Sequence, residues 1–389
     1  MPTRSSADLI VIGAGVVGAA CAYYAARSGL RVTVIDRGAV AGGTTGAGEG
    51  NLLVSDKEPG PELELALLSV RLWRELAGLL PPLIEYEAKG GLVVASDEAS
   101  MAALRGFAAR QERAGVQAEQ VTGDRLRDLE PHLAPDLAGG FRYPQDAQVQ
   151  PARAAAHLLR AAAGGQGSGG VRLRLGEEVT GVLTGANGEV RGVRTARGDV
   201  RAPYVVNAAG SWGGALARLA GAGLPVLPRR GFVLVTEPLP RVVRHKVYAA
   251  DYVADVASGS AGLQTSAVVE GTPSGPVLIG ASRERVGFDR TLSVEALRRL
   301  AAQATRLFPV LTGVRAMRTY AGFRPYLPDH LPAIGPDPRV PGLLHACGHE
   351  GAGIGLAPAT GLIIARVLSG AQLPLDIDPF RPDRFGVAG

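Results

Sequence analysis

The stretch "DLIVIGAGVVG" at residues 8–18 constrains the fold more than any other part of this sequence. Its β-branched run ends in glycine, which is typical of a buried strand that enters a tight turn. The alanine-rich residues 19–28 predict a helix with Gly29 as its C-terminal cap, and residues 30–36 predict a second strand ending in Asp36. Strand, glycine turn, helix and strand in this order predict a βαβ unit of an α/β domain.

The glycines of this unit have the GxGxxG spacing, and each has a mechanical task. Gly13 permits the tight turn, Gly15 lets the backbone approach a pyrophosphate, and Gly18 lets the helix pack closely on the sheet. Asp36 follows about 20 residues later, where a ribose hydroxyl needs an acceptor. GxGxxG alone also fits a glycine-rich turn in an ordinary βαβ unit. The complete series of elements predicts a dinucleotide-binding site.

A second glycine-rich segment, "GGTTGAGEGN" at residues 42–51, distinguishes between the two common dinucleotides. Its backbone amides and hydroxyls are suited to wrapping a long, buried cofactor. An NAD-only dehydrogenase needs no such loop, and the chain has no second GxGxxG unit with a terminal acid for a separate NAD site. The pattern therefore favours FAD.

The strand, glycine turn and helix pattern returns twice, at residues 204–221 and 343–370, so one domain is built from the beginning, middle and end of the chain. We expect an FAD-binding domain from residues 1–80, 145–222 and 320–389. The intervening residues 81–144 and 223–319 would form a substrate-binding domain with its own sheet. "GGQGSGG" at residues 164–170 predicts a linker, and the proline-rich residues 319–336 predict an irregular loop between the domains.

Composition excludes several classes of function. The net charge is only +5, and arginines are scattered rather than clustered, which argues against a nucleic-acid partner. The two cysteines, Cys21 and Cys347, have no metal-ligand spacing and fit a reducing compartment, so no metal site is expected. The first apolar run lacks a signal-peptide pattern and is a poor membrane span. We therefore expect a cytoplasmic protein without a transmembrane segment, although peripheral membrane association is compatible with the sequence.

Several motifs together resemble the FAD-dependent amino-acid oxidase superfamily of glycine oxidase, D-amino-acid dehydrogenases and sarcosine oxidases. They are "VIGAGVVG" with Asp36, "GGTTGAGEGN", "EEVTGV", "VVNAAGSW", "GFRPYLPDHLPAIGP" and "GHEGAGIGLAPATG". "GTTGAGEGN" and "GHEGAGI" look most like the flavin subunits of hydroxyproline and opine dehydrogenases and of hydrogen cyanide synthase. The resemblance implies an α/β fold with a Rossmann-like FAD domain of the glutathione-reductase type. An α+β substrate domain on an antiparallel or mixed sheet would be interleaved with it.

The resemblance also implies which residues hold FAD. The early glycines and Asp36 would bind the ADP half, Val179 would bond the adenine through its backbone, and the terminal loop would border the isoalloxazine ring. Amides at the start of the last helix would stabilise the negative charge of reduced flavin, unless this loop is a plain strand-to-helix turn. The full set is Gly13, Gly15, Val16, Val17, Gly18, Asp36, Arg37, Gly43, Thr44, Thr45, Glu49, Gly50, Asn51, Val179, Ala209, Gly210, Trp212, Arg324, Gly348, His349, Glu350, Gly351, Ala352, Gly353 and Ile354.

The implied reaction is oxidation of a C–N bond by hydride transfer to flavin N5, which gives an imine. The substrate would be a D-amino acid, a proline-like or hydroxyproline-like acid, glycine or an N-substituted amino acid. Arg324 falls where glycine oxidase clamps the substrate carboxylate, although an ion pair with Asp329 is the alternative. His349 and Glu350 are candidates for contact with the substrate nitrogen. Gln264 is a candidate for the pocket wall, with placement in the core or on the surface as the alternative. Tyr252 and Tyr326 are weaker candidates.

Some positions depart from these relatives. Gly322 stands where sarcosine oxidase attaches flavin through a cysteine, so we expect non-covalent FAD. Gly351 stands where glycine oxidase has a second substrate arginine, which leaves fewer cations in the pocket and disfavours glycine and sarcosine. The alternative function is a flavin subunit that passes electrons to iron–sulfur or other partner subunits, or a relay flavoprotein without its own substrate. A homo-oligomer is also compatible with the sequence.

Overall fold

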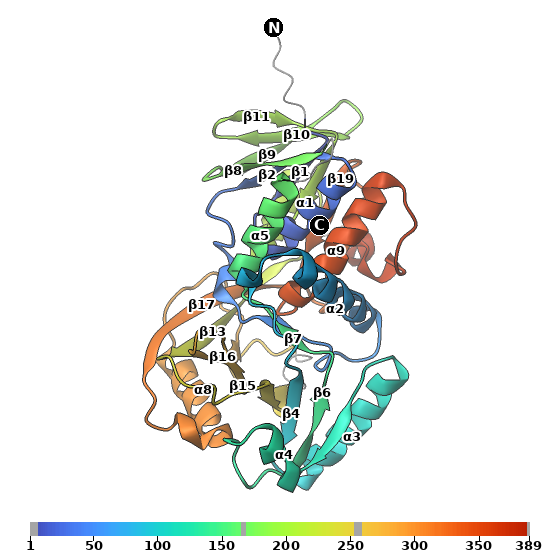
Figure 1. Cartoon of the computed structure of the whole chain (residues 1–389). Coiled ribbons are helices and arrows are strands. Elements are labelled where there is room, and N and C mark those ends of the chain that lie inside the picture. Colours follow the sequence, from blue (N-terminus) through green and yellow to red (C-terminus); the bar gives the residue numbers. More distant parts are fainter. Residues whose placement is uncertain (1–6, 165–168, 253–258, 387–389) are drawn as a thin grey trace.

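The computed structural model describes residues 7–164, 169–252 and 259–386, and two sheets form its framework (Figure 1). The six-stranded sheet has the order β18-β19-β12-β1-β2-β8. Its strands are β1 (Leu9–Ile12), β2 (Arg31–Asp36), β8 (Gly170–Leu175), β12 (Tyr204–Asn207), β18 (Ala333–Pro336) and β19 (Leu343–Cys347). All neighbours are parallel except the edge pair β18 and β19. All four residues of β1 are buried, as its uninterrupted apolar sequence predicts.

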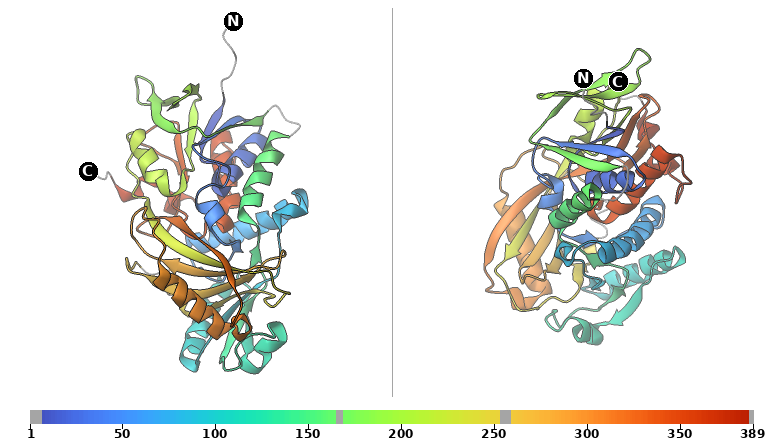
Figure 2. Two further views of the ribbon diagram at one scale, coloured as in Figure 1. Left: turned by 90° about the vertical axis from the view of Figure 1, so that its left-hand side faces the viewer. Right: turned by 45° about the horizontal axis from the view of Figure 1, so that its top comes forward.

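Helices cover this sheet and bring distant parts of the chain together. α1 (Val16–Arg27) packs against α5 (Pro151–Ala163) and α9 (Gly353–Ser369), and α2 (Pro61–Leu79) packs against α9. Figure 2 shows these helices around the sheet from two further directions. α1 and α9 approach so closely because both present small residues. A Cβ on Gly361 would lie 2.5 Å from the backbone carbonyl carbon of Ala20.

The start of α9 lacks one helical hydrogen bond, and a side chain of α2 replaces it. Pro358 lies inside this helix and has no N–H to donate to the carbonyl of Ile354. The indole of Trp73, which is completely buried on α2, donates to that carbonyl at 3.0 Å. The carbonyl that proline leaves without its helical donor is thereby satisfied, and α2 fixes the position of the loop that precedes α9.

The eight-stranded sheet has the order β17-β13-β16-β15-β14-β4-β6-β5 and is mainly antiparallel, with one parallel pair, β4 and β14. Its strands are β4 (Gly91–Ala95), β5 (Glu119–Thr122), β6 (Gly139–Tyr143), β13 (Leu227–Thr236), β14 (Lys246–Ala249), β15 (Gln264–Gly271), β16 (Val277–Arg283) and β17 (Ala316–Tyr326). α3 (Glu98–Arg113), α4 (Gly123–Leu129) and α8 (Val294–Leu307) pack on it in the lower part of Figure 1.

Smaller elements complete the fold. β9 (Val179–Thr184), β10 (Val190–Thr195) and β11 (Gly198–Arg201) form an antiparallel sheet beside the six-stranded one, and α6 (Gly213–Leu219) follows β12. β3 (Asn51–Leu52) pairs with β7 (Ala147–Gln148). The structure confirms the predicted α/β class with an interleaved second sheet. No helix within the described ranges is both long and apolar enough to cross a membrane.

The prediction of an irregular loop at residues 319–336 is wrong. Residues 316–326 form β17, the longest strand of the eight-stranded sheet, and residues 333–336 form β18. β17 lies at the sheet edge and pairs only with β13, so Pro325 removes no hydrogen bond that a central strand would need. A domain boundary at residue 320 would cut this strand. Residues 165–168 of the predicted linker lie outside the described residues.

The contact between α1 and α9 gives a prediction about stability. Gly361→Val should destabilise the folded protein by about 1–3 kcal/mol, because its side chain would strike the backbone of Ala20. Gly106 on α3 is the matched control, since a Cβ there meets no atom closer than 3.9 Å. Gly106→Ala should be neutral or stabilising by up to about 1 kcal/mol. Urea unfolding followed by circular dichroism tests both variants, and unchanged stability of Gly361→Val would contradict the close packing.

Candidate active site

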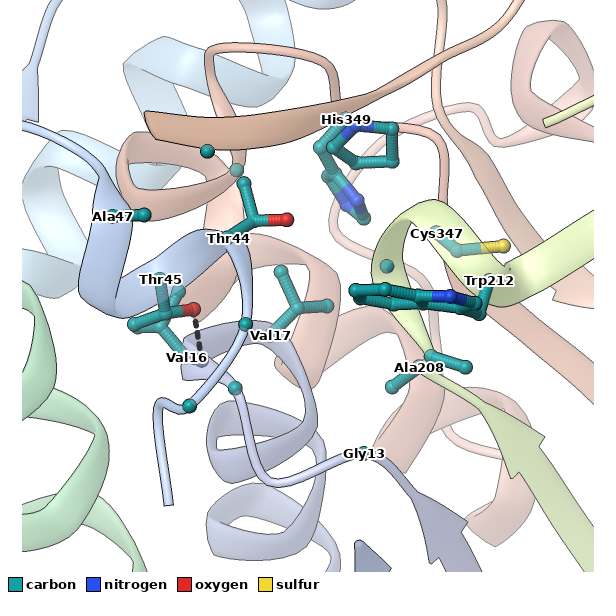
Figure 3. A pocket seen from close by; sticks show the side chains of 18 of the residues that line it. Gly13, Val16, Val17, Thr44, Thr45, Ala47, Ala208, Trp212, Cys347 and His349 are labelled. Carbon is teal, nitrogen blue, oxygen red and sulfur yellow. Dashed lines mark hydrogen bonds between the residues drawn. The ribbon is translucent and has the colours of Figure 1, made fainter. Parts of the chain in front are cut away.

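A cavity of about 510 Å³ lies between the two large sheets and is lined by residues from both termini (Figure 3). Its position follows from the parallel strands. Segments that follow the carboxyl ends of β1, β2, β8, β12 and β19 all line it, because parallel strands end at the same edge of a sheet. The opposite wall comes from β13 and β17 of the eight-stranded sheet.

The loop between β1 and α1 forms one end of the cavity. Gly13 has φ +113°, a conformation that side chains rarely adopt, and a Cβ there would strike the carbonyl oxygen of Ala208 at 2.3 Å. The carboxylate of Asp36 accepts the amide of Ala14 at 2.7 Å, which ties the end of β2 to this loop. A Cβ on Gly15 would lie 3.0 Å from the hydroxyl of Thr45. The loop is therefore compact, and its backbone borders the cavity.

The second glycine-rich segment covers the first. The hydroxyl of Thr45 accepts the amide of Val16 at 3.0 Å, the bond drawn in Figure 3. The hydroxyl of Thr44 donates to the carbonyl of Phe323 on β17 at 2.6 Å. This segment therefore connects the first helix of the six-stranded sheet to the edge strand of the other sheet. Farther along the wall, the guanidinium of Arg37 lies 4.2 Å from the ring of Trp212.

The loop between β19 and α9 provides backbone amides and a buried imidazole. α9 has no side-chain cap at its N-terminus, and Gly351, Gly353 and Ile354 line the cavity. Burial lowers the pKa of His349 to about 3, so its ring is neutral at physiological pH. Its Nε2 lies 3.0 Å from the hydroxyl of Thr360, which itself donates to the carbonyl of Leu356. Nε2 therefore carries the proton, and Nδ1 is left as an acceptor.

Arg324 projects from β17 into the other end of the cavity. Its Nη1 donates to the carbonyl of Ser282 at 2.7 Å, which fixes the guanidinium. No carboxylate of the described residues lies within 4.0 Å of it, and the alternative partner Asp329 pairs with Arg384 at 2.6 Å instead. Burial, and next the positive charge of Arg283, lower the pKa of Arg324. This arginine is therefore a partly buried cation that is available to an anionic ligand.

Glu350 borders the same region but is already paired. Arg229 donates to one of its carboxylate oxygens at 2.5 Å, and Nδ1 of His330 lies 2.9 Å from the other. Although burial opposes it, these two partners hold the pKa of Glu350 below its ordinary value. Gln264 accepts a hydrogen bond from Arg229 at 3.0 Å and is not one of the residues that line the cavity. Gln264 therefore lies beside Arg229 rather than in the cavity wall, which is the alternative placement for this residue.

Glu49 connects the cavity to a buried ion-pair group. Its carboxylate lies 3.5 Å from Nζ of Lys246, which also contacts Glu270 at 2.6 Å. Burial raises the pKa of Glu49, and a Cβ on Gly280 would lie within 3 Å of its carboxylate. Lys246 is therefore committed to two carboxylates behind the wall.

Most residues predicted for cofactor binding do line the cavity. They are Gly13, Gly15, Val16, Val17, Asp36, Arg37, Gly43, Thr44, Thr45, Glu49, Asn51, Val179, Ala209, Gly210, Trp212, Arg324, His349, Glu350, Gly351, Gly353 and Ile354. Gly18, Gly50, Gly348 and Ala352 do not. A Cβ on Gly18 would strike the carbonyl of Gly13, one on Gly50 would strike that of Val149, and one on Gly348 would strike Leu327. These three glycines allow the loops to pack rather than facing the cavity.

Sequence reasoning missed Arg229 and Arg283. Both lie at the ends of apolar runs, "PRRGFVLV" and "VLIGASRER", where charged residues usually mark the exit of a strand to solvent. In the structure both are buried, with exposed fractions of 0% and 5%. Neither lines the cavity, but Arg229 pairs with Glu350 and Arg283 lies beside Tyr252, and both of these partners do line it. Tyr252, a weaker candidate, lines the cavity, whereas Tyr326 does not.

The cavity walls fit an extended dinucleotide with a polar ring. Oδ1 of Asn51 is buried and has no hydrogen-bond partner in the described part of the chain, so it can accept an N–H from a ligand. The uncapped amides at the start of α9 supply donors. Among the described residues, no group of acidic, histidine or cysteine side chains could hold a metal ion.

Comparison with known proteins agrees with this geometry. The chain is 31% identical to hydrogen cyanide synthase subunit HcnC of Pseudomonas aeruginosa, over 97% of this chain and 96% of that protein. It superposes on the crystal structure of glycine oxidase from Geobacillus kaustophilus with a TM-score of 0.86 and 28% identity, covering 97% and 99% of the two chains. The L-proline dehydrogenase of P. horikoshii shares the fold, with a TM-score of 0.85, 24% identity and 98% coverage of both chains. The model of the FAD dependent oxidoreductase (DAO) family matches residues 8–367. The chain therefore belongs to the FAD dependent oxidoreductase family, and its cofactor is FAD.

Proposed function

We propose that this protein oxidises the C–N bond of an amino or imino acid, with Arg324 binding the carboxylate of the substrate. The observation that carries the proposal is a partly buried guanidinium at the cavity without a carboxylate partner among the described residues. A guanidinium offers five donors in a fixed fork, and among the described residues only the carbonyl of Ser282 takes one of those of Arg324. A charge-assisted bond to a carboxylate in such a place is worth about 1.5–3 kcal/mol.

Glycine at position 351 is part of this arrangement. A Cβ there would lie 3.4 Å from Nε of Arg324, so any larger side chain would approach the guanidinium. The space beside Arg324 is therefore kept for the substrate rather than for the protein. The carboxylate of an amino acid fits it because its two oxygens match two parallel N–H donors.

The cavity-lining residues from the three glycine-rich loops are assigned to FAD. Gly13, Gly15 and Asp36 would hold the ADP half, and the amides of the terminal loop would lie along the ring. When bound without a covalent link, FAD supplies a two-electron acceptor for the hydride on the carbon beside nitrogen. The other product is an imine, which water hydrolyses outside the redox step.

The remaining groups of the wall orient the substrate nitrogen. Glu350 stays ionised because of Arg229 and His330, and a carboxylate has lone pairs beyond those that these two use. Nδ1 of the neutral His349 is a second acceptor. An amine held by such acceptors keeps its carbon directed toward the ring. A substrate that binds as the neutral amine needs no general base, so none is assigned.

The relatives support this class of reaction. Glycine oxidase is named for an amino-acid substrate. Its structure aligns with 97% of this chain, a span that includes both large sheets. HcnC is named as a subunit of a synthase, which favours one alternative: that this chain is the flavin subunit of a larger dehydrogenase. Its two cysteines are too few for a four-cysteine iron–sulfur cluster, so such a cluster would belong to a partner. Oxygen consumption by the isolated chain would favour the self-sufficient enzyme, and dye reduction without oxygen consumption would favour the complex.

Removal of the guanidinium tests the proposed role of Arg324. Arg324→Met should retain bound FAD but lower the second-order rate constant for anaerobic flavin reduction by amino acids at least about 10-fold, because a charge-assisted bond is lost. Stopped-flow absorbance with a panel of D-amino acids, proline analogues and N-alkylglycines measures it.

Arg318 is the matched control for this experiment, because it lies on the same strand and its side chain is exposed. Arg318→Met should reduce at the wild-type rate. Equal rates for Arg324→Met and wild type would remove Arg324 from the substrate site. Absence of flavin reduction by any member of the panel in the wild type would refute the proposed function itself.

The assignment of the first loop to FAD has its own test. Gly15→Val places a branched side chain against the hydroxyl of Thr45 and into the path of the cofactor, so FAD content and affinity should fall at least about 10-fold. Gly188→Val provides a control, because a Cβ there meets no atom within 4 Å, although its positive φ adds local strain. Flavin content after gel filtration and titration of the apoprotein measure both variants.

A further inference from the structure

Arg283 is a buried arginine close to the cavity, although it is not itself one of the lining residues. It is the last residue of β16, and only 5% of its surface is exposed. Its guanidinium lies 5.1 Å from the ring centre of Tyr252, which lines the cavity. Within the described ranges, no carboxylate lies within 4.0 Å of its guanidinium. None of its nitrogens is both buried from solvent and without a hydrogen-bond partner. Its nitrogens are therefore neither sealed off nor held by a carboxylate of the described residues.

The acidic side chains around Arg283 and Arg324 are committed to other cations. Each of them has an ion pair within 4.0 Å that involves neither arginine. These pairs are Asp56–Lys57 at 2.7 Å, Glu62–Lys57 at 3.8 Å, Glu49–Lys246 at 3.5 Å, Glu270–Lys246 at 2.6 Å and Glu350–Arg229 at 2.5 Å. Arg283 and Arg324 are left as two neighbouring guanidiniums that share no carboxylate.

The side chain of Arg324 crosses Gly231 of β13 and reaches the carbonyl of Ser282, the residue that precedes Arg283 on β16. After burial, the charge of Arg283 is the strongest effect that lowers the pKa of Arg324. Two like charges in a buried site repel, and hydrogen-bond donors without acceptors are costly there. A ligand with one carboxylate can compensate only one of these arginines. A ligand with two acidic groups compensates both.

We propose that Arg283 and Arg324 form a paired anion site and that the substrate is an amino or imino acid with a second carboxylate. This inference rests on the proposed function. Arg324 binds the carboxylate beside the oxidised carbon, and Arg283, with Tyr252 as the adjacent wall, binds the second. The second acidic group is then a determinant of specificity rather than a participant in the oxidation.

Matched substrates test the proposal in the wild-type holoenzyme. D- and L-glutamate are compared with the corresponding glutamines, D- and L-aspartate with the asparagines, and iminodiacetate with sarcosine. For at least one pair the acid should reduce the flavin about 10-fold faster or more at low concentration, since a second charge-assisted bond forms. Equal or faster reduction by the neutral or monocarboxylic member of every pair would overturn the proposal while leaving the proposed function intact.

Variants locate the effect. Arg283→Gln should remove most of the preference for the acid and change the rate for its uncharged partner less than about 3-fold. Arg283→Lys should restore part of the preference. Arg285→Gln is the matched control, because Arg285 is exposed two residues farther along, and it should behave as wild type. An equal loss for both members of a pair in Arg283→Gln would overturn the assignment.

Binding of compounds that cannot be oxidised separates this inference from the reaction. Malonate, succinate and glutarate are titrated against acetate, propionate and butyrate, with perturbation of the flavin spectrum as the readout. At least one dicarboxylate should bind about 10-fold tighter or more than its monocarboxylate, and Arg283→Gln should abolish that difference. Equal affinities would overturn the paired site. Selective dicarboxylate binding without flavin reduction by any amine would refute the proposed reaction and retain the site.

Discussion

The backbone contact between α1 and α9 is the constraint on which the site depends. At Gly361 the two helices approach so closely that a Cβ would lie 2.5 Å from the backbone of Ala20. Because the helices follow β1 and β19, strands that end at the same sheet edge, this contact brings both of their N-termini to one cavity. More than 300 residues separate the two loops in the sequence. The loop between β19 and α9 is thus placed by helix packing, and Trp73 secures it through the carbonyl of Ile354.

The opposite wall of the cavity carries charged side chains in the interior of the protein, and these need partners. β13 and β17 place Arg229 directly opposite Arg324, and like charges in such a pair repel. Glu350 and Gln264 bond Arg229, whereas in the described part of the chain Arg324 is held only by a backbone carbonyl. The protein therefore compensates one arginine internally and leaves the other for a ligand. Buried ion pairs elsewhere follow the same principle, because all three lysines of the chain contact carboxylates.

Local sequence patterns predicted the elements of the FAD half of the molecule well, because each pattern lies within one short stretch of sequence. The apolar run of β1, the glycine spacing and Asp36 act within one βαβ unit, and the glycines of the terminal loop are equally local. β17 escaped prediction because Pro325 is a strand breaker by composition and is tolerated only at an edge, which the sequence does not reveal. Arg283 escaped for a related reason. Its burial depends on the packing of β16 beside Tyr252, a contact made by residues that are about 30 positions apart.

The division of charge also explains why glycine at position 351 is compatible with a cationic site. An arginine there would face Arg324 from the terminal loop, whereas Arg283 approaches from β16. Either arrangement gives two arginines, but the distance between the second arginine and Arg324, which a ligand must span, differs between them. A small amino acid can bridge cations that converge on one carboxylate, but cations that are separated by the width of β13 favour a longer, doubly acidic molecule. Substrate choice in this fold can therefore shift through the strand that carries the second arginine, while the cofactor loops stay unchanged.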